Sequence, residues 1–84
     1  MYRFIIALSC FLMTLAAPIS AQDFEKGVAA YHDGDYATAF KEFKPLALAG
    51  NSPSQYNLGV MYHKGFGVPQ DYKEALKWYT LAAE

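Results

Sequence analysis

The sequence predicts an all-α protein in which antiparallel helix pairs stack as a short α-solenoid, behind an N-terminal signal-peptide helix. The stack is indicated by two observations. Glycine-containing stretches separate segments with helical periodicity, and two of these segments match at an offset of 36 residues. The matching pairs are Asp35 and Asp71, Tyr36 and Tyr72, Ala39 and Ala75, Lys41 and Lys77, Phe43 and Tyr79, and Ala47 and Ala83. A period of this size corresponds to one helix-turn-helix unit, which gains stability by packing on a neighbour.

Residues 1–21 have the pattern of a secretory signal peptide. Arg3 supplies a positive charge, residues 4–17 are almost entirely apolar, and the small residues Ser20 and Ala21 follow. The apolar run is shorter than the roughly 20 residues of a membrane-spanning helix, so we expect cleavage after Ala21. The sequence therefore predicts a periplasmic or secreted protein that meets the membrane only through its uncleaved signal peptide.

Cysteine usage and charge restrict the mature protein further. The single cysteine, Cys10, lies inside the apolar run, and lipid attachment there is disfavoured because too few apolar residues precede it. Cleavage after Ala21 leaves 63 residues with six lysines and eight carboxylates, a formal charge of −2. Such a balance argues against a polyanion-binding surface, and we expect no nucleic-acid partner. A core of this size is below the roughly 70–80 residues that are comfortably stable alone, so aromatic residues or a partner must add stability.

Residues 22–49 are predicted to form the first helix pair. The first helix has Asp23 as a plausible N-cap and ends at Asp33, and the second is capped by Asp35. Pro45 predicts a kink or a weakened last turn, because proline has no backbone N–H to donate. The stripe residues are Phe24, Gly27, Val28 and Tyr31 in the first helix and Tyr36, Ala39, Phe40, Phe43, Leu46 and Ala47 in the second.

Residues 50–84 are predicted to form the second pair. Its first helix begins with Ser52 as N-cap, a proline at the first helical position and Gln55 completing a capping box, and it ends at Gly65. Gly59 inside this helix costs on the order of 1 kcal/mol relative to alanine, which indicates that another helix approaches closely there. The expected contact face consists of Gln55, Leu58, Gly59 and Tyr62.

The last helix is predicted to begin with a second capping pattern, formed by Asp71 and Glu74. It has a broad apolar surface made of Tyr72, Ala75, Leu76, Trp78, Tyr79, Ala82 and Ala83. Because no later helix covers that surface, we expect marginal stability or self-association through Leu76, Trp78 and Ala83. Stacks usually need about three units, so a truncated piece of a longer array is an alternative interpretation.

A specific set of glycines and aromatic residues runs through residues 49–84: Leu58-Gly59, Tyr62, Gly65-Phe66-Gly67-Val68, Asp71, Ala75, Trp78-Tyr79 and Ala82-Ala83. This set resembles a Sel1-like repeat, a relative of the tetratricopeptide repeat, with departures at Pro53 and Ser54. Residues 22–49 have the shorter tetratricopeptide-like spacing, since they lack the Gly65–Val68 insertion. The resemblance implies a right-handed stack that serves as a protein-binding scaffold, often exported in bacteria for envelope signalling or secretion, with no common catalytic site.

Three groups of residues could suggest chemistry, and each has a plainer explanation. The Gly65-Phe66-Gly67 stretch lacks the Lys-Ser or Lys-Thr of a phosphate cradle and permits a turn between helices. His32 and His63 are too few for a zinc site, which takes three or four ligands. Asp33 and Asp35 lie in a short turn, where Asp35 already acts as a cap. We therefore predict no catalytic residue, no cofactor and no metal site.

The aromatic residues are assigned to the core before any ligand site, because their spacing packs neighbouring helices together. They are Tyr31, Tyr36, Phe40, Phe43, Tyr62, Trp78 and Tyr79. The candidate surface for a protein partner is the opposite face of the first helix in each pair. In the third helix this face contains Asn57, Val60 and Lys64, with Tyr56 or His63 at its edges. The leading interpretation is an exported, non-enzymatic scaffold. The alternative is a small envelope hydrolase, for which the sequence offers no catalytic constellation.

Overall fold

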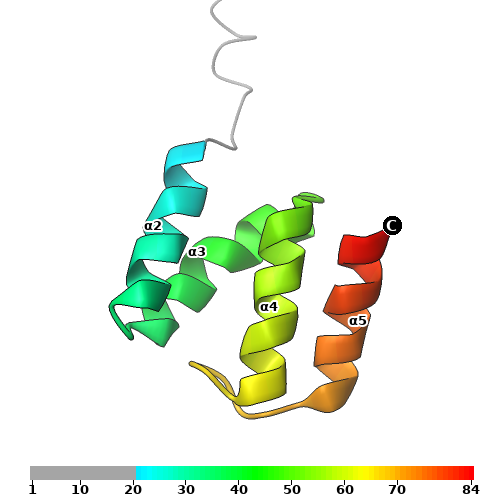
Figure 1. Cartoon of the computed structure of the whole chain (residues 1–84). Coiled ribbons are helices and arrows are strands. Elements are labelled where there is room, and N and C mark those ends of the chain that lie inside the picture. Colours follow the sequence, from blue (N-terminus) through cyan, green and yellow to red (C-terminus); the bar gives the residue numbers. More distant parts are fainter. Residues whose placement is uncertain (1–20) are drawn as a thin grey trace, which may run out of the picture.

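The structure is a computed structural model that describes residues 21–84, so all of the predicted signal peptide except Ala21 lies outside the described residues, including Cys10. Four helices follow one another: α2 (Ala21–His32), α3 (Tyr36–Leu48), α4 (Ser52–Lys64) and α5 (Tyr72–Ala83). They run alternately in opposite directions, and residues 21–84 contain no strand (Figure 1). The predicted all-α class is confirmed. Within the same residues, no helix has the length and apolar character needed to cross a membrane.

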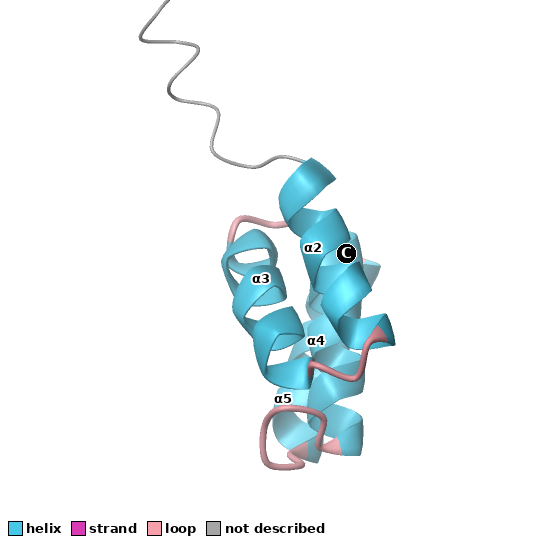
Figure 2. Ribbon diagram, turned by 90° about the vertical axis from the view of Figure 1, so that its left-hand side faces the viewer, coloured by secondary structure: helices cyan, strands magenta, loops and turns pink. Residues whose placement is uncertain are grey.

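The helices form a stack because each one packs on its neighbour in the chain (Figure 2). Three-residue turns join α2 to α3 and α3 to α4, whereas the seven residues 65–71 join α4 to α5. The longer connection contains the glycine-rich insertion, and it reaches across α4 to the first helix pair.

The core lies where the apolar stripes of the four helices meet. Phe43, Leu58, Met61 and Trp78 are each at most 2% exposed. Half-buried aromatic residues pack around these side chains: Phe24, Tyr31, Tyr36, Phe40, Tyr62 and Phe66. The aromatic stripe predicted from the sequence is therefore core, with a fully buried centre and a half-exposed border.

Each helix pair is closed by an aromatic ring that lies over a glycine. A Cβ atom added to Gly27 would lie 2.6 Å from Cε1 of Phe43, and one added to Gly59 would lie 2.6 Å from Cδ1 of Tyr79. The close approach predicted at Gly59 is confirmed, and Gly27 repeats it in the first pair. Two ring pairs at equivalent positions also match, because Phe24–Phe43 and Tyr56–Tyr79 both have centroids 5.6 Å apart.

The predicted contact face of α4 is wrong in one respect, because its residues meet two different helices. Gly59 faces α5, whereas the Gln55 side chain donates a hydrogen bond from Nε2 to the carbonyl oxygen of Ala47 in α3, at 3.1 Å. Tyr62 also faces α3, with its ring 5.7 Å from that of Phe40. Because α4 lies between α3 and α5, its apolar surface is divided between them.

The glycine loop joins the two pairs. The ring of Phe66 stacks on Tyr36 at 4.3 Å with an interplanar angle of 7°. A Cβ atom at Gly67 would lie 2.7 Å from the Tyr36 carbonyl oxygen, and Gly67 has a φ of +76°, so glycine is required there for both space and backbone conformation. The insertion in the second pair thus contributes much of the interface with the first.

The helix ends confirm most of the predicted caps. Asp35 accepts from the Thr38 N–H, Asp71 accepts from the N–H groups of Lys73 and Glu74, and Gly65 ends α4 in the left-handed conformation. The Ser52 capping box is wrong, because Asn51 is the N-cap of α4. Its side-chain oxygen accepts from the Ser54 N–H at 2.9 Å and from the Ser54 hydroxyl at 2.6 Å. The Gln55 side chain donates its hydrogen bond to the Ala47 carbonyl oxygen and takes no part in capping α4.

Two further expectations are wrong. The first helix begins at Ala21, two residues before the expected cap Asp23. Trp78 is only 2% exposed, so it cannot take part in self-association as predicted. The large apolar side chains that α5 does expose are Tyr72, Leu76 and Leu81.

Candidate partner-binding groove

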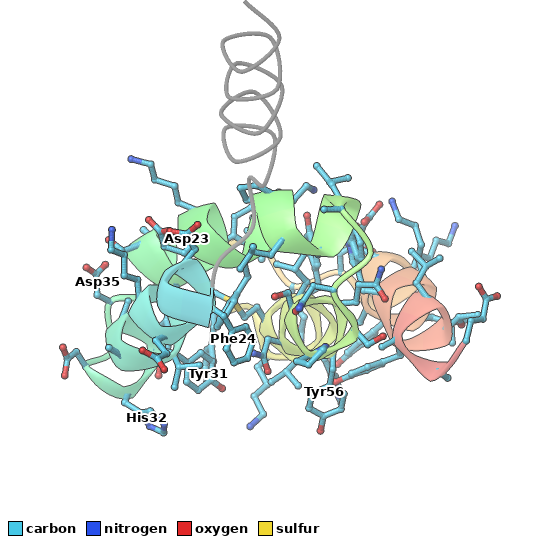
Figure 3. The ribbon with its side chains drawn as sticks, turned by 90° about the horizontal axis from the view of Figure 1, so that it is seen from above. Asp23, Phe24, Tyr31, His32, Asp35 and Tyr56 are labelled. Atoms are coloured by element: carbon cyan, nitrogen blue, oxygen red, sulfur yellow. The ribbon has the colours of Figure 1, made fainter. Side chains whose placement is uncertain are left out.

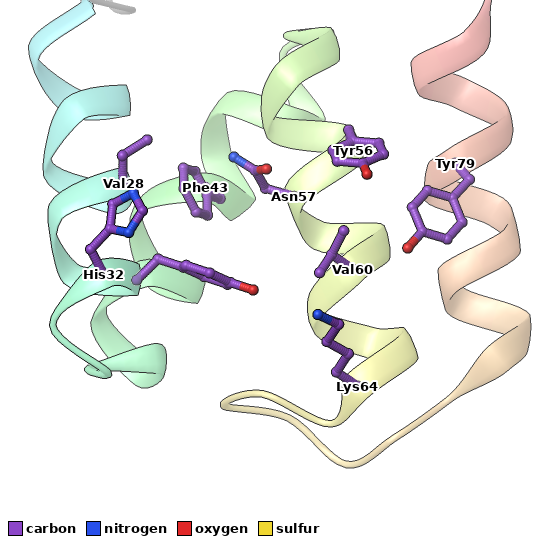
Figure 4. A pocket seen from close by; sticks show the side chains of 9 residues that line it. Val28, His32, Phe43, Tyr56, Asn57, Val60, Lys64 and Tyr79 are labelled. Atoms are coloured by element: carbon purple, nitrogen blue, oxygen red, sulfur yellow. The ribbon is translucent and has the colours of Figure 1, made fainter.

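A hollow of about 450 Å³ lies between the first helices of the two pairs, α2 and α4. It is lined by Val28, Tyr31, His32, Phe43, Tyr56, Asn57, Val60, Lys64 and Tyr79, and we call it the groove (Figure 4). Tyr31, His32 and Tyr56 lie along the same side of the stack, with α3 on the opposite side (Figure 3). The groove therefore belongs to the surface formed by the first helix of each pair.

The two walls of the groove are related by the internal repeat. Val28 and Val60 stand at equivalent positions 32 residues apart, as do His32 and Lys64. Phe43 from α3 and Tyr79 from α5 contribute the rings that lie over the two glycines. The two valines thus form an apolar centre between α2 and α4. His32 and Lys64 lie at the end of the groove where these two helices end.

Four of the five residues predicted as a partner surface lie together here: Tyr56, Asn57, Val60 and Lys64. His63 does not line the groove. Its ring lies 5.4 Å from that of Tyr72, next to the loop between α4 and α5. The helical period places residue 63 at the edge of the face formed by residues 57, 60 and 64, and its side chain turns from that edge toward α5.

The sequence indicated the first helix of each pair as the partner surface, but no residue of α2 was named for it. The structure adds Val28, Tyr31 and His32 from that helix. A signal was present in the 32-residue offset, which relates Val28 to Val60 and the paired glycines Gly27 and Gly59 to each other. That offset differs from the 36-residue offset between the second helices because the insertion lies between them. A search at a single period therefore finds one helix of each pair and misses the other.

The charge of the groove is basic. Lys64 and His32 are its basic side chains, and none of the nine lining residues carries a carboxylate. Burial raises the pKa of Tyr79 above the usual 10.0, and the neighbouring hydroxyls of Tyr56 and Tyr31 raise it further. The tyrosine therefore stays neutral around pH 7 and presents a hydroxyl that can donate a hydrogen bond.

The residues weighed for chemistry have structural roles or lie apart. Asp35 caps α3 and Asp71 caps α5, while Gly65 and Gly67 turn the chain. Within residues 21–84, no group of three or more His, Cys, Asp or Glu side chains is placed to hold a metal ion. The groove combines the apolar side chains of Val28, Phe43 and Val60 with polar atoms from its other lining residues, which is the composition of a binding site.

Comparisons with known proteins find a known repeat in the second helix pair. Residues 52–84 match the model of the Sel1 repeat family. The chain is 42% identical over 41 residues to a sel1-like repeat-containing protein of Acanthamoeba polyphaga mimivirus, covering 49% of this chain and 7% of that protein. It is 44% identical over 43 residues to DAP3-binding cell death enhancer 1 of Mus musculus and of Rattus norvegicus, covering 51% of this chain and 8% of each relative. The chain therefore spans only a small part of the length of these curated relatives. No solved structure matches it.

Proposed function

We propose, on the premise that residues 52–84 are a Sel1 repeat and so a scaffold for protein–protein interaction, that this chain is an exported, non-enzymatic scaffold. Its partner is a protein segment that binds in the groove between α2 and α4, and its setting is bacterial envelope signalling or secretion. The observation that carries the proposal is the groove itself, to which both helix pairs contribute equivalent residues.

The lining of the groove indicates the chemistry of the segment. Val28, Val60 and the ring of Phe43 favour apolar side chains, because burying them removes apolar surface from water. Tyr56 and Asn57 add hydroxyl and amide groups that can bond a peptide backbone. Lys64 with no carboxylate in the lining favours an acidic group at the end of the groove where α4 finishes. The proposed partner is thus an apolar segment with a nearby Asp, Glu or C-terminal carboxylate.

The experiment is a selection from a displayed library of random peptides against the purified chain. We expect the enriched peptides to combine apolar residues with an acidic group. Val60→Glu removes apolar surface from the groove wall and places a carboxylate four residues before Lys64, where it pairs with that lysine and repels the acidic group of the peptide; a loss of 1.4 kcal/mol corresponds to a tenfold change in affinity. We therefore expect at least a roughly tenfold loss of affinity for the selected peptides, measured by fluorescence anisotropy.

Two variants make the test specific to the groove. Leu48→Glu introduces the same charge at a side chain of α3 that is 69% exposed and outside the groove, and it should leave binding unchanged. Lys64→Glu should weaken the acidic peptides while sparing neutral ones. Equal binding by wild type and Val60→Glu would refute the groove as the partner surface.

Export is supported by the order of features in residues 1–21, where a positive charge, an apolar run and small residues follow one another. Expression in a bacterial host should yield a processed chain that begins after Ala21 and is released by osmotic shock. N-terminal sequencing of that fraction measures the cleavage point. Retention of Met1 on a chain confined to the cytosol would contradict export while leaving the groove proposal open to its own test.

A further inference from the structure

Trp78 of α5 has a buried hydrogen-bond donor that nothing in the described part of the chain satisfies. Its side chain is 2% exposed, and no acceptor among residues 21–84 lies within hydrogen-bonding distance of the indole Nε1. Buried polar groups nearly always have a partner, because leaving one without a hydrogen bond is costly. Since an indole N–H can only donate, the group that completes this site must bring an acceptor.

Two lysines from different helices lie over the same ring. The Nζ atom of Lys44 in α3 is 5.4 Å from the centroid of the Trp78 ring, and Nζ of Lys77 in α5 is 5.1 Å from it. Lys44 also lies over the ring of Phe40, at 5.5 Å. The indole is therefore placed where α3 and α5 meet, beside two positive charges, and an acceptor with negative charge is favoured there over a neutral one.

The charge of this cluster suits a carboxylate. Glu74 pairs with Lys77 at 3.4 Å and offsets part of the positive charge. A group with a single negative charge matches what remains better than a phosphate monoester, which carries nearly two. The Lys77 side chain is 55% exposed and Lys44 is half-buried, and both have long rotatable stems. The two lysines can thus turn aside from the ring to admit a ligand.

Each of the two helices carries an exposed leucine one turn beyond its lysine. Leu48 follows Lys44 by four residues and is 69% exposed, and Leu81 follows Lys77 by four residues and is 38% exposed. Residues four apart are neighbours on a helix surface. Because α3 and α5 run in the same direction, both leucines lie toward the same end of the cluster (Figure 1). The surface therefore offers apolar area next to the lysines.

We propose that the surface where α3 meets α5 is a second binding site, which takes an acidic side chain of a protein segment together with an apolar side chain next to it. The carboxylate accepts from the ammonium groups of Lys44 and Lys77 and from Nε1 of Trp78, and the apolar side chain lies beside the leucines. Figure 3 shows α3 on the opposite side of the stack from Tyr56, so this site and the groove can be occupied at the same time.

The test uses the indole itself as the reporter. The chain contains a single tryptophan, so its indole N–H gives one resonance in the proton–nitrogen correlation spectrum of the labelled full chain. The probe is the capped tripeptide Glu-Ala-Leu, and capped Gln-Ala-Leu is its neutral match. At constant ionic strength we expect the first to move the indole proton resonance downfield in a saturable way and the second to leave it in place. Lys44→Gln and Lys77→Gln should each weaken the binding by roughly fivefold, because a charge-assisted hydrogen bond is lost.

Two variants serve as controls. Lys26→Gln removes the charge of an exposed lysine of α2, outside the cluster around Trp78, and should leave the affinity for Glu-Ala-Leu unchanged. Val60→Glu alters the groove, which also favours an acidic group, and should leave the movement of the indole resonance unchanged. A failure of the groove and a failure of this site are therefore seen separately.

Several outcomes would overturn the proposal. One is an indole resonance that does not move, and another is an equal response to the two tripeptides. Acetate that acts as strongly as Glu-Ala-Leu would remove the protein segment as the occupant, since a free carboxylate would then suffice. Inorganic phosphate or phosphatidylglycerol vesicles that bind more tightly than the tripeptide, and lose that binding in Lys44→Gln, would assign the site to a phosphate group instead.

Discussion

The two glycines inside α2 and α4 determine how closely the helices of each pair can approach. At Gly59 the ring of Tyr79 occupies the space that a Cβ atom would fill, at 2.6 Å from Cδ1. Glycine at this position costs on the order of 1 kcal/mol of helix propensity. The ring packing that it permits offsets this cost, because an aromatic side chain buries a large apolar area. At Gly27 the ring of Phe43 occupies the corresponding space, so the same loss of helix propensity is offset by ring packing.

Gly59→Ala tests this balance. Overpacking costs about 1–3 kcal/mol, and the better helix propensity of alanine returns about 1 kcal/mol, so we expect a net destabilisation of up to about 2 kcal/mol. Urea unfolding followed by circular dichroism measures it. In the background of Tyr79→Ala the ring is absent, and Gly59→Ala should then be neutral or stabilising. A stabilising effect of Gly59→Ala with Tyr79 in place would show that the ring moves aside at no cost.

The helices begin where a side-chain oxygen can accept from the free N–H groups of the first turn. Asp35, Asn51 and Asp71 supply that oxygen for α3, α4 and α5. The Asn51 side-chain oxygen also accepts a hydrogen bond from the hydroxyl of Ser54, which is fully buried. Its loss would leave a buried hydroxyl without this acceptor as well as opening the helix end.

Asn51→Ala is therefore expected to cost about 1–2 kcal/mol, at the upper end for an N-cap. Ser52→Ala changes an exposed residue of the first turn and should stay within about 0.5 kcal/mol. Chemical denaturation of both variants under the same conditions gives the comparison. If Ser52→Ala were the more damaging of the two, the cap assignment taken from the structure would be wrong.

The whole stack depends on the joint between the two pairs, and the loop after α4 contributes much of it. Phe66 lies against Tyr36 at 4.3 Å and against Tyr31 at 6.1 Å, so one ring of the second pair contacts α2 and α3 of the first. Repeat proteins gain cooperativity from such neighbour interfaces. The first pair should thus depend on the second for part of its stability.

Phe66→Ala should destabilise the chain by about 1–3 kcal/mol, from lost burial and lost ring contacts. Hydrogen exchange followed by mass spectrometry should show faster exchange in α2 and α3 as well as in α4. Gln70→Ala is the control in the same loop, because the Gln70 side chain bonds to the His63 carbonyl and the Tyr72 hydroxyl, both within the second pair. Its effect should be confined to α4 and α5. Unchanged exchange in α2 and α3 of Phe66→Ala would contradict the coupling.

The groove was only partly predictable, for a geometric reason. Tyr56, Asn57, Val60 and Lys64 could be named because one helix with period 3.6 places them near one another. Val28 and His32 belong to another helix, and their distance from Val60 depends on how two pairs pack across α3. His63 was named because it adjoins this face in sequence, and the structure places its ring against Tyr72.

The sequence by itself determined the helices, the two aspartate caps, the glycine stop of α4 and the internal repeat, because each depends on residues within a few turns of one another. Packing decided the rest. The division of α4 between α3 and α5, the burial of Trp78 and the groove between α2 and α4 all arise where side chains from distant segments compete for the same space. Only the folded chain settles that competition, since a ring such as Phe66 can reach Tyr36 only after the loop that carries it has been placed.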